Sequence, residues 1–490
     1  MQTITTVRRY PALFWVALLL AAFACPAALA QSPKLIVRNA TIMTMADGQR
    51  APIVGYLSVA ADGTVLAVAA GEPPASLHSA SVVDAHGDYI IPGFISAHSH
   101  LYQAAFRGLG KDQTLHGWIA ALSKQSNHSS AEDDYWFDLY GSLDHIEHGI
   151  TSVFDFARGG GGPNDPDDSH QKAQFRAKQD SGIRFIHAYG IGRIAAPNVV
   201  APDVSLAQAR TRLKAFLDWT ATQPKSSQFF SVMISGSTAF NTTYQQPAVE
   251  AALMKEFHLG NETHFLEPPD DQGDQRSKFR WILDSGLLTH DLIFGHFIHT
   301  DDFILQETAK AGASMSWQPL SNGRLASGVA DIPKYLKMGI RVGMGVDGEA
   351  SADLADPFEN MRMGLYAIRD KYEDAGIMSP YQVLYLHTMG SADVLNIKDK
   401  VGSLEPGKYA DFLLINPARL GVPLEDPYAN VVFVAAEEDI DSVYIGGEMQ
   451  VDHGKMLHHD LPKIQAEAYH RAQATAAANA AAPATPRTPR

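Results

Sequence analysis

Eight short apolar segments alternate with longer amphipathic stretches between residues 89 and 349, and this alternation constrains the fold more than any other feature. The segments lie at residues 89–100, 151–156, 183–191, 229–237, 261–267, 292–299, 314–321 and 341–349, and helical patterns such as 133–149 and 353–372 occur among and after them. Such alternation is typical of successive strand–helix units that form a parallel sheet. Because eight units close a barrel, we predict an α/β protein with a (β/α)8 barrel.

The segments on either side of this region have an all-β pattern. Short strands with Gly-containing turn signals lie before the barrel at 35–45, 55–69 and 81–90, and after it at 410–416 and 441–455. We predict that the two flanks pair into one small β-sandwich beside the barrel. The predicted boundaries are 31–88 and 400–462 for the two parts of the sandwich and 89–399 for the barrel.

The two ends of the chain differ from the middle in composition. Residues 1–30 combine paired arginines, an apolar run at 12–24 and small residues at their end, which is the pattern of a secretory signal. We predict cleavage before Gln31 and export to the periplasm, with an uncleaved membrane anchor as the alternative. The only cysteine, Cys25, would leave with the signal, so the mature chain would form no disulfide. We predict that the Ala/Pro-rich residues 463–490 form a disordered tail.

The overall composition limits the classes of partner. An apolar content of 46% against 19% charged residues is typical of a packed globular protein. The formal net charge of −15, with no Lys/Arg cluster beyond short pairs, argues against nucleic acid or an anionic membrane as partner. We therefore expect a small-molecule substrate and no membrane contact after signal cleavage. The oligomeric state stays open, and a homo-oligomer is compatible with the sequence.

Two histidines one residue apart end the first predicted strand. Residues i and i+2 of a strand face the same side, so His98 and His100 would both point into the barrel mouth and could chelate one ion. The chain has 20 histidines, so about one such pair is expected by chance. A zinc site needs further nitrogen and oxygen ligands. Candidates near the ends of later predicted strands are His264, His296 and Asp347.

Several motifs in a fixed order carry a resemblance to a known family. They are "IIPGFISAHSHLYQAAFRGLGKDQTLHGWI", "HGITSVFDF", "THFLE", "FGHFIH", "LSNGRLASGVADIPKYLKMGIRVGMGVDGEAS" and "VGSLEPGKYADFLLIN". From about Lys34 to Leu457 the chain resembles the amidohydrolase superfamily. Within it, the chain is most similar to the branch that contains cytosine, guanine and adenosine-type deaminases and triazine chlorohydrolases.

The resemblance implies a specific site. It assigns the metal ligands to His98, His100, His264 and Asp347, and the handling of protons to Glu267, His296 and Asp347. Two-metal members of the superfamily bridge their ions with a carboxylated lysine at the end of strand four, and residues 229–240 contain neither lysine nor an acidic residue. We therefore expect one divalent metal. Zinc is the first candidate, and iron and manganese are alternatives because the same ligands suit all three.

These groups predict hydrolysis. A divalent cation held by three imidazoles and a carboxylate acidifies water near neutral pH. Asp347 can accept the proton of that water, His296 can orient it, and Glu267 can pass a proton to a ring nitrogen of the substrate. We predict an exported, deaminase-like hydrolase that cleaves a C–N bond in a nitrogen heterocycle. The alternatives are an exported amidase, carbamate hydrolase or dehalogenating hydrolase, and, from another class, a non-catalytic binding protein.

A few residues allow two interpretations. Many nucleobase deaminases of this branch carry a histidine where this chain has Trp317, and the indole either stacks on a substrate or packs outward on a helix. The Gly/Asp-rich segment 157–170 is either a lid over the barrel mouth or an insertion. His299 is interpreted as a packing or supporting histidine, because its strand parity differs from that of His296. Arg107 and Trp118 are candidates to line the pocket.

Overall fold

The computed structural model describes residues 32–79, 81–159, 165, 167–192, 204–241, 243–421 and 426–481. The predicted signal segment, residues 1–30, lies outside these ranges. Within them, no helix combines the length and the apolar character needed to span a membrane.

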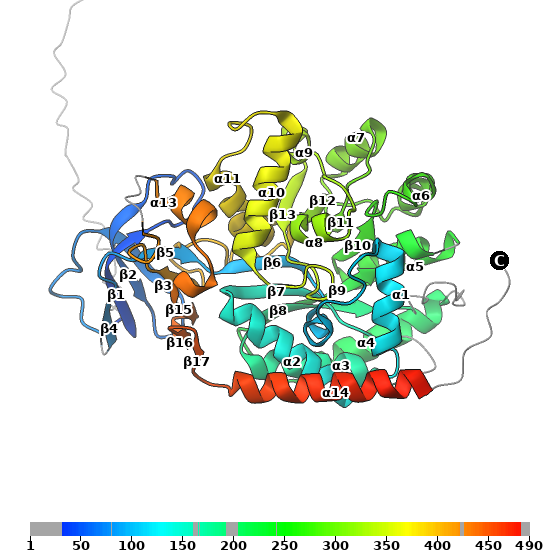
Figure 1. Cartoon of the computed structure of the whole chain (residues 1–490), viewed down its shortest axis with the longest axis horizontal. Coiled ribbons are helices and arrows are strands. Elements are labelled where there is room, and N and C mark those ends of the chain that lie inside the picture. Colours follow the sequence, from blue (N-terminus) through cyan, green and yellow to red (C-terminus); the bar gives the residue numbers. More distant parts are fainter. Residues whose placement is uncertain are drawn as a thin grey trace, which may run out of the picture.

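Eight parallel strands form a nearly closed barrel, which confirms the predicted fold class (Figure 1). They are β6 (Phe94–Ser99), β7 (Ile150–Phe156), β8 (Arg184–Gly190), β9 (Phe229–Gly236), β10 (Asn261–Phe265), β11 (Leu292–His296), β12 (Ser314–Trp317) and β13 (Arg341–Met344). They follow one another in sequence order around the sheet. A parallel bridge between Ser99 and Asp347 joins the first strand to the loop after the last, where the Asp347 amide donates to the His98 carbonyl at 3.0 Å.

Helices cover the outside of the barrel and connect its strands. The longer ones are α2 (Ala131–Glu147), α3 (Ser169–Ser181), α4 (Leu206–Thr222), α5 (Gln245–Phe257), α6 (Gln272–Ser285), α7 (Asp302–Ala311) and α10 (Pro357–Tyr372). Local sequence explains where they begin: Ser130 forms a capping box with Asp133 at the start of α2, and Asp356 caps α10 just before a proline.

The remaining helices between the strands lie in the loops. The α-helical ones are α1 (Leu115–Ser126), α8 (Pro319–Arg324), α9 (Ile332–Lys337), α11 (Pro380–Tyr385), α12 (Ser391–Val394) and α13 (Pro427–Ala429). Single turns of 3₁₀ or π type are η1 (Leu101–Phe106), η2 (Thr238–Phe240), η3 (Leu386–Gly390), η4 (Asn430–Val434) and η5 (Glu437–Asp439). Of these, η1 and α8 carry or support groups of the site described below.

The two flanks of the chain pair with each other beside the barrel, as the sequence predicts, and their strands form one mixed sheet (Figure 1). Its strands are β1 (Leu35–Ile42), β2 (Ile53–Val59), β3 (Val65–Ala70), β4 (Ser81–Asp84), β5 (Tyr89–Pro92), β14 (Phe412–Ile415), β15 (Ile440–Ile445), β16 (Glu448–Asp452) and β17 (Lys455–Met456). The flanks join where β5 pairs antiparallel with β14. Buried side chains such as Val37, Leu57 and Phe412 form a separate apolar core there.

The segment 89–100, predicted as one strand, divides at Gly93. Residues 89–92 belong to the mixed sheet and residues 94–99 to the barrel. A Cβ atom at position 93 would lie 2.2 Å from Oγ1 of Thr151, so only glycine allows the chain to pass so close to β7. The chain therefore enters the barrel directly from the mixed sheet.

The predicted disordered tail is a helix over most of its length. Helix α14 (Leu461–Ala481) runs along the outside of the barrel against α1 and α2, and only residues 482–490 of the tail lie outside the described ranges (Figure 1). Its buried residues, among them Ile464, Ala468 and Ala472, recur at helical spacing and form one apolar stripe. Alanine favours helix, and this stripe gives the helix a face to bury, so the compositional prediction of disorder was wrong for residues 463–481.

One buried ion pair connects the barrel to the mixed sheet. Arg184, at the start of β8, donates from Nε and Nη2 to the two carboxylate oxygens of Asp411 at 2.6 and 2.9 Å, and both side chains are buried. Asp411 also accepts from the backbone amide of Gly446. The pair thus connects β8 of the barrel with the residue before β14 and with the residue after β15.

Breaking this pair is expected to destabilise the protein strongly. Asp411→Ala leaves a buried guanidinium without its partner, and we expect a loss of about 3–5 kcal/mol in the free energy of unfolding, measured by urea denaturation. The matched control is Asp218→Ala, which breaks the exposed Lys214–Asp218 pair of 2.7 Å on α4. Removal of that pair is expected to change stability by less than about 0.5 kcal/mol. Equal effects of the two substitutions would contradict the role given to Asp411.

Candidate metal centre and active site

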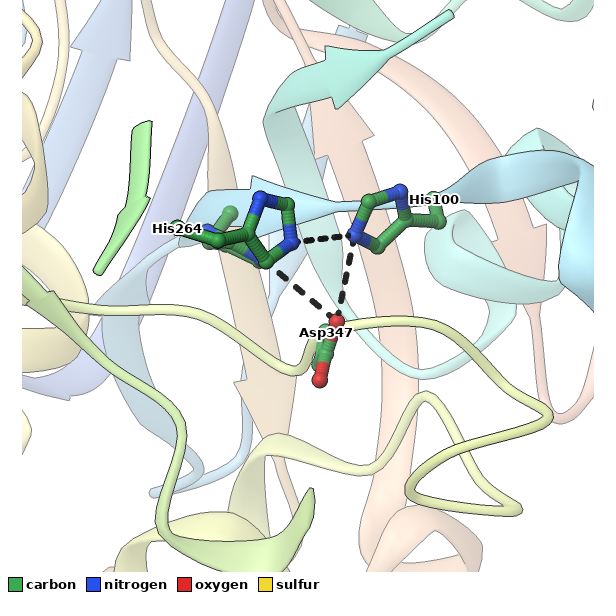
Figure 2. A group of neighbouring side chains, drawn as sticks. His100, His264 and Asp347 are labelled. Atoms are coloured by element: carbon green, nitrogen blue, oxygen red, sulfur yellow. Dashed lines mark hydrogen bonds and ion pairs between the residues drawn. The ribbon is translucent and has the colours of Figure 1, made fainter. Parts of the chain in front are cut away.

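Four side chains that the sequence singled out converge at the carboxyl ends of the barrel strands. His98 and His100 come from the end of β6, His264 from β10 and Asp347 from the loop after β13. Nε2 of His264 lies 3.1 Å from Nε2 of both His98 and His100. Oδ1 of Asp347 lies 3.5 Å from Nε2 of His98 and 3.4 Å from Nε2 of His100. Figure 2 shows His100, His264 and Asp347 pointing toward one another.

The donor set fits a divalent transition metal. Three imidazole nitrogens and one carboxylate oxygen are common zinc ligands, and tetrahedral ligands about 2.0–2.1 Å from an ion would be about 3.3 Å apart. The separations of 3.1–3.5 Å within the group match that value. In the described part of the chain this is the one group of acidic, histidine or cysteine side chains arranged to hold a metal ion.

A buried carboxylate supports the first of these histidines. Oε1 of Glu262 lies 2.6 Å from Nδ1 of His98, and both side chains are completely buried. Burial opposes the charged imidazole, but the carboxylate outweighs it and raises the pKa of His98 to about 9. A metal ligand must present a lone pair, so metal binding would release the Nε2 proton of His98. Glu262 then keeps Nδ1–H and orients the ring, as carboxylates behind metal-binding histidines do.

The other two imidazoles are neutral without such support. Burial lowers the pKa of His100 to about 4, and burial together with the charge of His98 holds the pKa of His264 well below its usual range. Burial opposes the charge of Asp347, yet the hydrogen bond and the charge of His98 keep its pKa well below normal. His100, His264 and Asp347 are therefore already in the forms that coordinate metals, and His98 reaches that form when it releases its Nε2 proton.

Glu267 and His296 lie next to each other beside this group. Oε2 of Glu267 is 3.5 Å from Nε2 of His296, and both side chains are at least 97% buried. Burial, reinforced by the negative charge of Asp347, raises the pKa of Glu267 to about 8. Burial also lowers the pKa of His296 to about 4. At neutral pH the site therefore contains a protonated carboxyl group facing a neutral imidazole, which is suited to moving a proton.

Aromatic rings surround the histidines. Phe156, at the end of β7, stacks on the ring of His100 with centroids 4.9 Å apart and an interplanar angle of 20°. It also contacts the ring of His264 at 4.6 Å, and Phe240 of η2 lies 6.2 Å from that ring. Apolar surroundings exclude water and strengthen electrostatic interactions within the site.

The structure decides between the two interpretations of Trp317 and shows what His299 contacts. Trp317 is 1% exposed, and its ring packs outward against Gly364 of α10. The contact is so close that a Cβ atom at position 364 would lie 2.6 Å from the ring. His299 lies beyond the end of β11, so strand parity does not apply to it, and its Nε2 donates to the carbonyl of Ser327 at 2.8 Å. It supports the loop that contains Ser327.

The two candidate pocket residues after β6 have structural partners. Arg107 pairs with the buried carboxylates of Glu349 and Asp144, and Nε1 of Trp118 donates to the carbonyl of Ala350 at 2.6 Å. Both therefore fasten the loop after β6 to the loop that follows Asp347. Residues 160–164 and 166 of the segment 157–170 lie outside the described ranges, so its interpretation as a lid or an insertion stays a prediction.

Three residues that support the side chains of the site were not identified from the sequence. Glu262 has a signal, because it precedes His264 by two residues and so shares its face of β10. Ser321 donates to Oδ2 of Asp347 at 2.6 Å, and Oδ1 of Asn322 lies 2.8 Å from Nδ1 of His296. These two lie in α8, within the longest motif of the resemblance, but spacing alone does not show which atoms they meet.

A (β/α)8 barrel with three histidines and an aspartate gathered at its carboxyl end defines a class of metal-dependent hydrolases. Residues 89–449 match the model of the Amidohydrolase family, and the chain belongs to that family. The predicted superfamily is thereby confirmed, and with it the prediction that the protein is an enzyme, a metal-dependent hydrolase of carbon–nitrogen bonds.

Relatives and structural neighbours agree with this placement. A 5-methylthioadenosine/S-adenosylhomocysteine deaminase of Symbiobacterium thermophilum is 27% identical, over 85% of this chain and 93% of its own length. An adenosine deaminase from Xanthomonas campestris with bound zinc has a TM-score of 0.78 at 19% identity, covering 90% of this chain and 98% of its own. A variant of the atrazine chlorohydrolase of Arthrobacter aurescens, in complex with zinc and atraton, also scores 0.78 at 22% identity, covering 89% and 100%.

Proposed function

We propose that the protein is a deaminase that removes an exocyclic amino group from a nitrogen heterocycle, with adenosine-type nucleosides as the first substrates to test. The observation that carries the proposal is the buried pair of Glu267 and His296, 3.5 Å apart, beside the His/His/His/Asp group. A protonated carboxyl group helps most when the electrophile is an amidine carbon, because a ring nitrogen can then accept its proton. The relatives named as 5-methylthioadenosine/S-adenosylhomocysteine deaminases support the choice of nucleosides.

We further propose that His98, His100, His264 and Asp347 hold one zinc ion. When bound, the cation supplies a Lewis acid that lowers the pKa of water into the neutral range. Strand β9 (Phe229–Gly236) contains no lysine or acidic residue that could bridge a second ion. The bound zinc in two structural neighbours supports the choice of metal.

The side chains of the site would divide the work as follows. Asp347 accepts a proton from the attacking water. The hydrogen bond from Ser321 to Oδ2 holds the Asp347 carboxylate in place for this step. Glu267 gives its proton to a ring nitrogen of the substrate as the carbon becomes tetrahedral, and His296 orients the groups between them. Asp347 then transfers its proton to the amino group, and ammonia leaves as the new C–OH bond becomes C=O. The hydroxyl proton released in this step returns to Glu267, which restores both side chains.

Ammonia release from a substrate panel tests this function. The purified protein is assayed with 5′-methylthioadenosine, adenosine, guanine, a chlorotriazine and simple amides. We expect ammonia from at least one aminated heterocycle and neither chloride release nor amide cleavage at comparable kcat/KM. Amide cleavage or chloride release without ammonia from any heterocycle would replace this proposal with the amidase or dehalogenase alternative.

Removal of the metal is expected to abolish activity reversibly. Dialysis against a chelator should lower the rate to the background, because the four side chains alone cannot acidify water sufficiently. One equivalent of zinc per chain should restore it, and iron or manganese should do so to other extents. Elemental analysis alongside the assay measures the stoichiometry. Full activity without metal, or a requirement for two ions per chain, would contradict the single-metal site.

We also propose that the protein is exported and acts in the periplasm. The support is the pattern of residues 1–30, with its paired arginines, apolar run and small-residue end. N-terminal sequencing of the protein recovered from a bacterial periplasmic fraction is expected to begin at Gln31. A cytoplasmic protein that retains residues 1–30 would contradict the proposal.

A further inference from the structure

One short segment touches all three side chains that are proposed to handle protons. Ser321 donates to Oδ2 of Asp347 at 2.6 Å, Oδ1 of Asn322 lies 2.8 Å from Nδ1 of His296, and Ser327 Oγ donates to Oε1 of Glu267 at 3.4 Å. The proton-handling groups themselves come from three different strand ends. The segment that unites them is residues 318–327, which contains α8 and the turn after it.

A second contact ties the segment to the end of β11. The backbone amide of His296 donates to Oε1 of Gln318 at 2.9 Å, and Gln318 in turn donates to Ser316 Oγ at 2.6 Å. His296 has a φ of 66°, a left-handed conformation that is uncommon outside glycine. The segment therefore holds both the backbone and the ring of His296.

The segment is itself held firmly. Its four hydroxyl and amide side chains, Gln318, Ser321, Asn322 and Ser327, are at most 2% exposed. The amide of Leu320 donates to Oδ1 of Asn360 at 3.1 Å, and Arg324 donates to the carbonyl of Leu109 at 2.8 Å and to Asp353 at 2.8 Å. Its positions are thus fixed from α10 on one side and from the loop after η1 on the other, which is the rigidity that a positioning element needs.

The contact with Asn322 determines which nitrogen of His296 carries a proton. A neutral imidazole has one donor and one acceptor nitrogen. The amide oxygen of Asn322 can only accept, so Nδ1 is the donor and Nε2 is left as the acceptor. Nε2 faces Oε2 of Glu267, an atom that has no other hydrogen-bond partner in the described part of the chain. A protonated Glu267 can donate to that acceptor.

We propose that residues 318–327 form the positioning element of the active site, and that Asn322 is the positioning residue that fixes His296 in the tautomer protonated on Nδ1. The catalytic consequence rests on the proposed function, because it takes Glu267 as the proton donor. The tautomer itself does not depend on the substrate. With Nε2 as an acceptor, His296 orients the Glu267 proton or a proton of the attacking water toward itself, and it cannot act as a donor to the substrate.

Nitrogen NMR of the zinc-loaded protein, labelled with ¹⁵N-histidine, tests the tautomer without any substrate. The signals of His296 are identified by their loss in His296→Gln. We expect Nδ1 of His296 to be protonated and Nε2 to be unprotonated in the wild type. In Asn322→Leu, which is similar in size but has no acceptor, we expect a mixture of the two tautomers. Protonation on Nε2 in the wild type, or an unchanged spectrum in the variant, would overturn the proposal.

Kinetics test the consequence. Asn322→Leu is expected to lower kcat by about 10- to 100-fold with KM nearly unchanged, as loss of a supporting hydrogen bond typically does. Asn322→Asp, which retains an acceptor for Nδ1–H, is expected to recover most of that loss. The control is Asn430→Leu, which removes a buried 2.7 Å bond to the hydroxyl of Tyr89 far from the site and should leave kcat unchanged.

Two results separate this inference from its alternatives. A kcat for Asn322→Leu within twofold of wild type would overturn the positioning role. If Asn322→Leu does not fold, Asn322→Ala provides the same comparison, because it also lacks an acceptor and has a smaller side chain. If no heterocycle is deaminated, the proposed function fails while the NMR result still decides the tautomer.

Discussion

Replacement of Asp347 by asparagine is expected to lower kcat by about 10³-fold or more while the fold remains intact. Asp347 contributes the only carboxylate of the metal-binding group, and Oδ1 lies within 3.5 Å of Nε2 of both His98 and His100. The amide keeps the shape of the side chain but removes its negative charge and its ability to accept a proton. The measurement is kcat on the substrate identified by ammonia release, with metal content and unfolding free energy determined on the same samples.

Asp356→Asn is the matched control for this substitution. Asp356 caps α10 by accepting from two backbone amides, and asparagine caps helices about as well as aspartate. Its activity and stability should therefore stay near those of wild type. A tenth or more of wild-type kcat in Asp347→Asn would show that another group accepts the proton. Unchanged ligand binding with no turnover in either protein would favour a binding protein on an enzyme scaffold.

The barrel could be predicted from the sequence because its strands are buried on both sides. Each of the eight apolar segments overlaps one barrel strand, and the chain order of the strands is also their order in the sheet. The boundary at Gly93 could not be predicted, because residues 89–100 read as one continuous apolar run. Only the close approach of Thr151 separates the strand of the mixed sheet from the strand of the barrel.

The candidate site was predictable for a related reason. In a parallel barrel the carboxyl ends of all strands meet at one face, so polar residues that end separate apolar runs are brought together there. The three predicted histidine ligands and Asp347 do lie within one group. Glu267 and His296 adjoin it, although both lie at or beyond the end of regular strand structure, where alternation no longer places a side chain.

The supporting contacts could be identified only from the structure. Ser321, Asn322 and Ser327 are ordinary polar residues in a loop-like motif, and nothing in their spacing shows that each meets a different strand end. For the tail, the sequence led to a wrong prediction of disorder, because its Ala-rich composition is compatible with disorder and with helix alike. The packing of α14 beside α1 and α2, which is a tertiary effect, decides between them.

Glu267→Gln is expected to lower kcat by about 10²- to 10⁴-fold without loss of metal. The amide occupies the same volume in this buried position but cannot supply the proton that a ring nitrogen needs. The pKa of Glu267 is raised to about 8, so its acid form predominates at neutral pH and is lost as the pH rises. In the wild type, kcat/KM should therefore fall above about pH 8, and this alkaline limb should be absent from the residual activity of the variant.

Glu262→Gln makes the decisive comparison, because the two glutamates lie on one strand-and-loop segment and serve different partners. Glu262 supports His98 at 2.6 Å, so its loss should weaken metal affinity by about 10- to 100-fold, and added zinc should restore much of the activity. Excess zinc should not rescue Glu267→Gln, since that carboxyl group acts on the substrate. Rescue of Glu267→Gln by zinc would show that Glu267 acts in metal binding and not in proton transfer. The proposed preference for an amidine carbon over an amide carbon would then have no chemical basis.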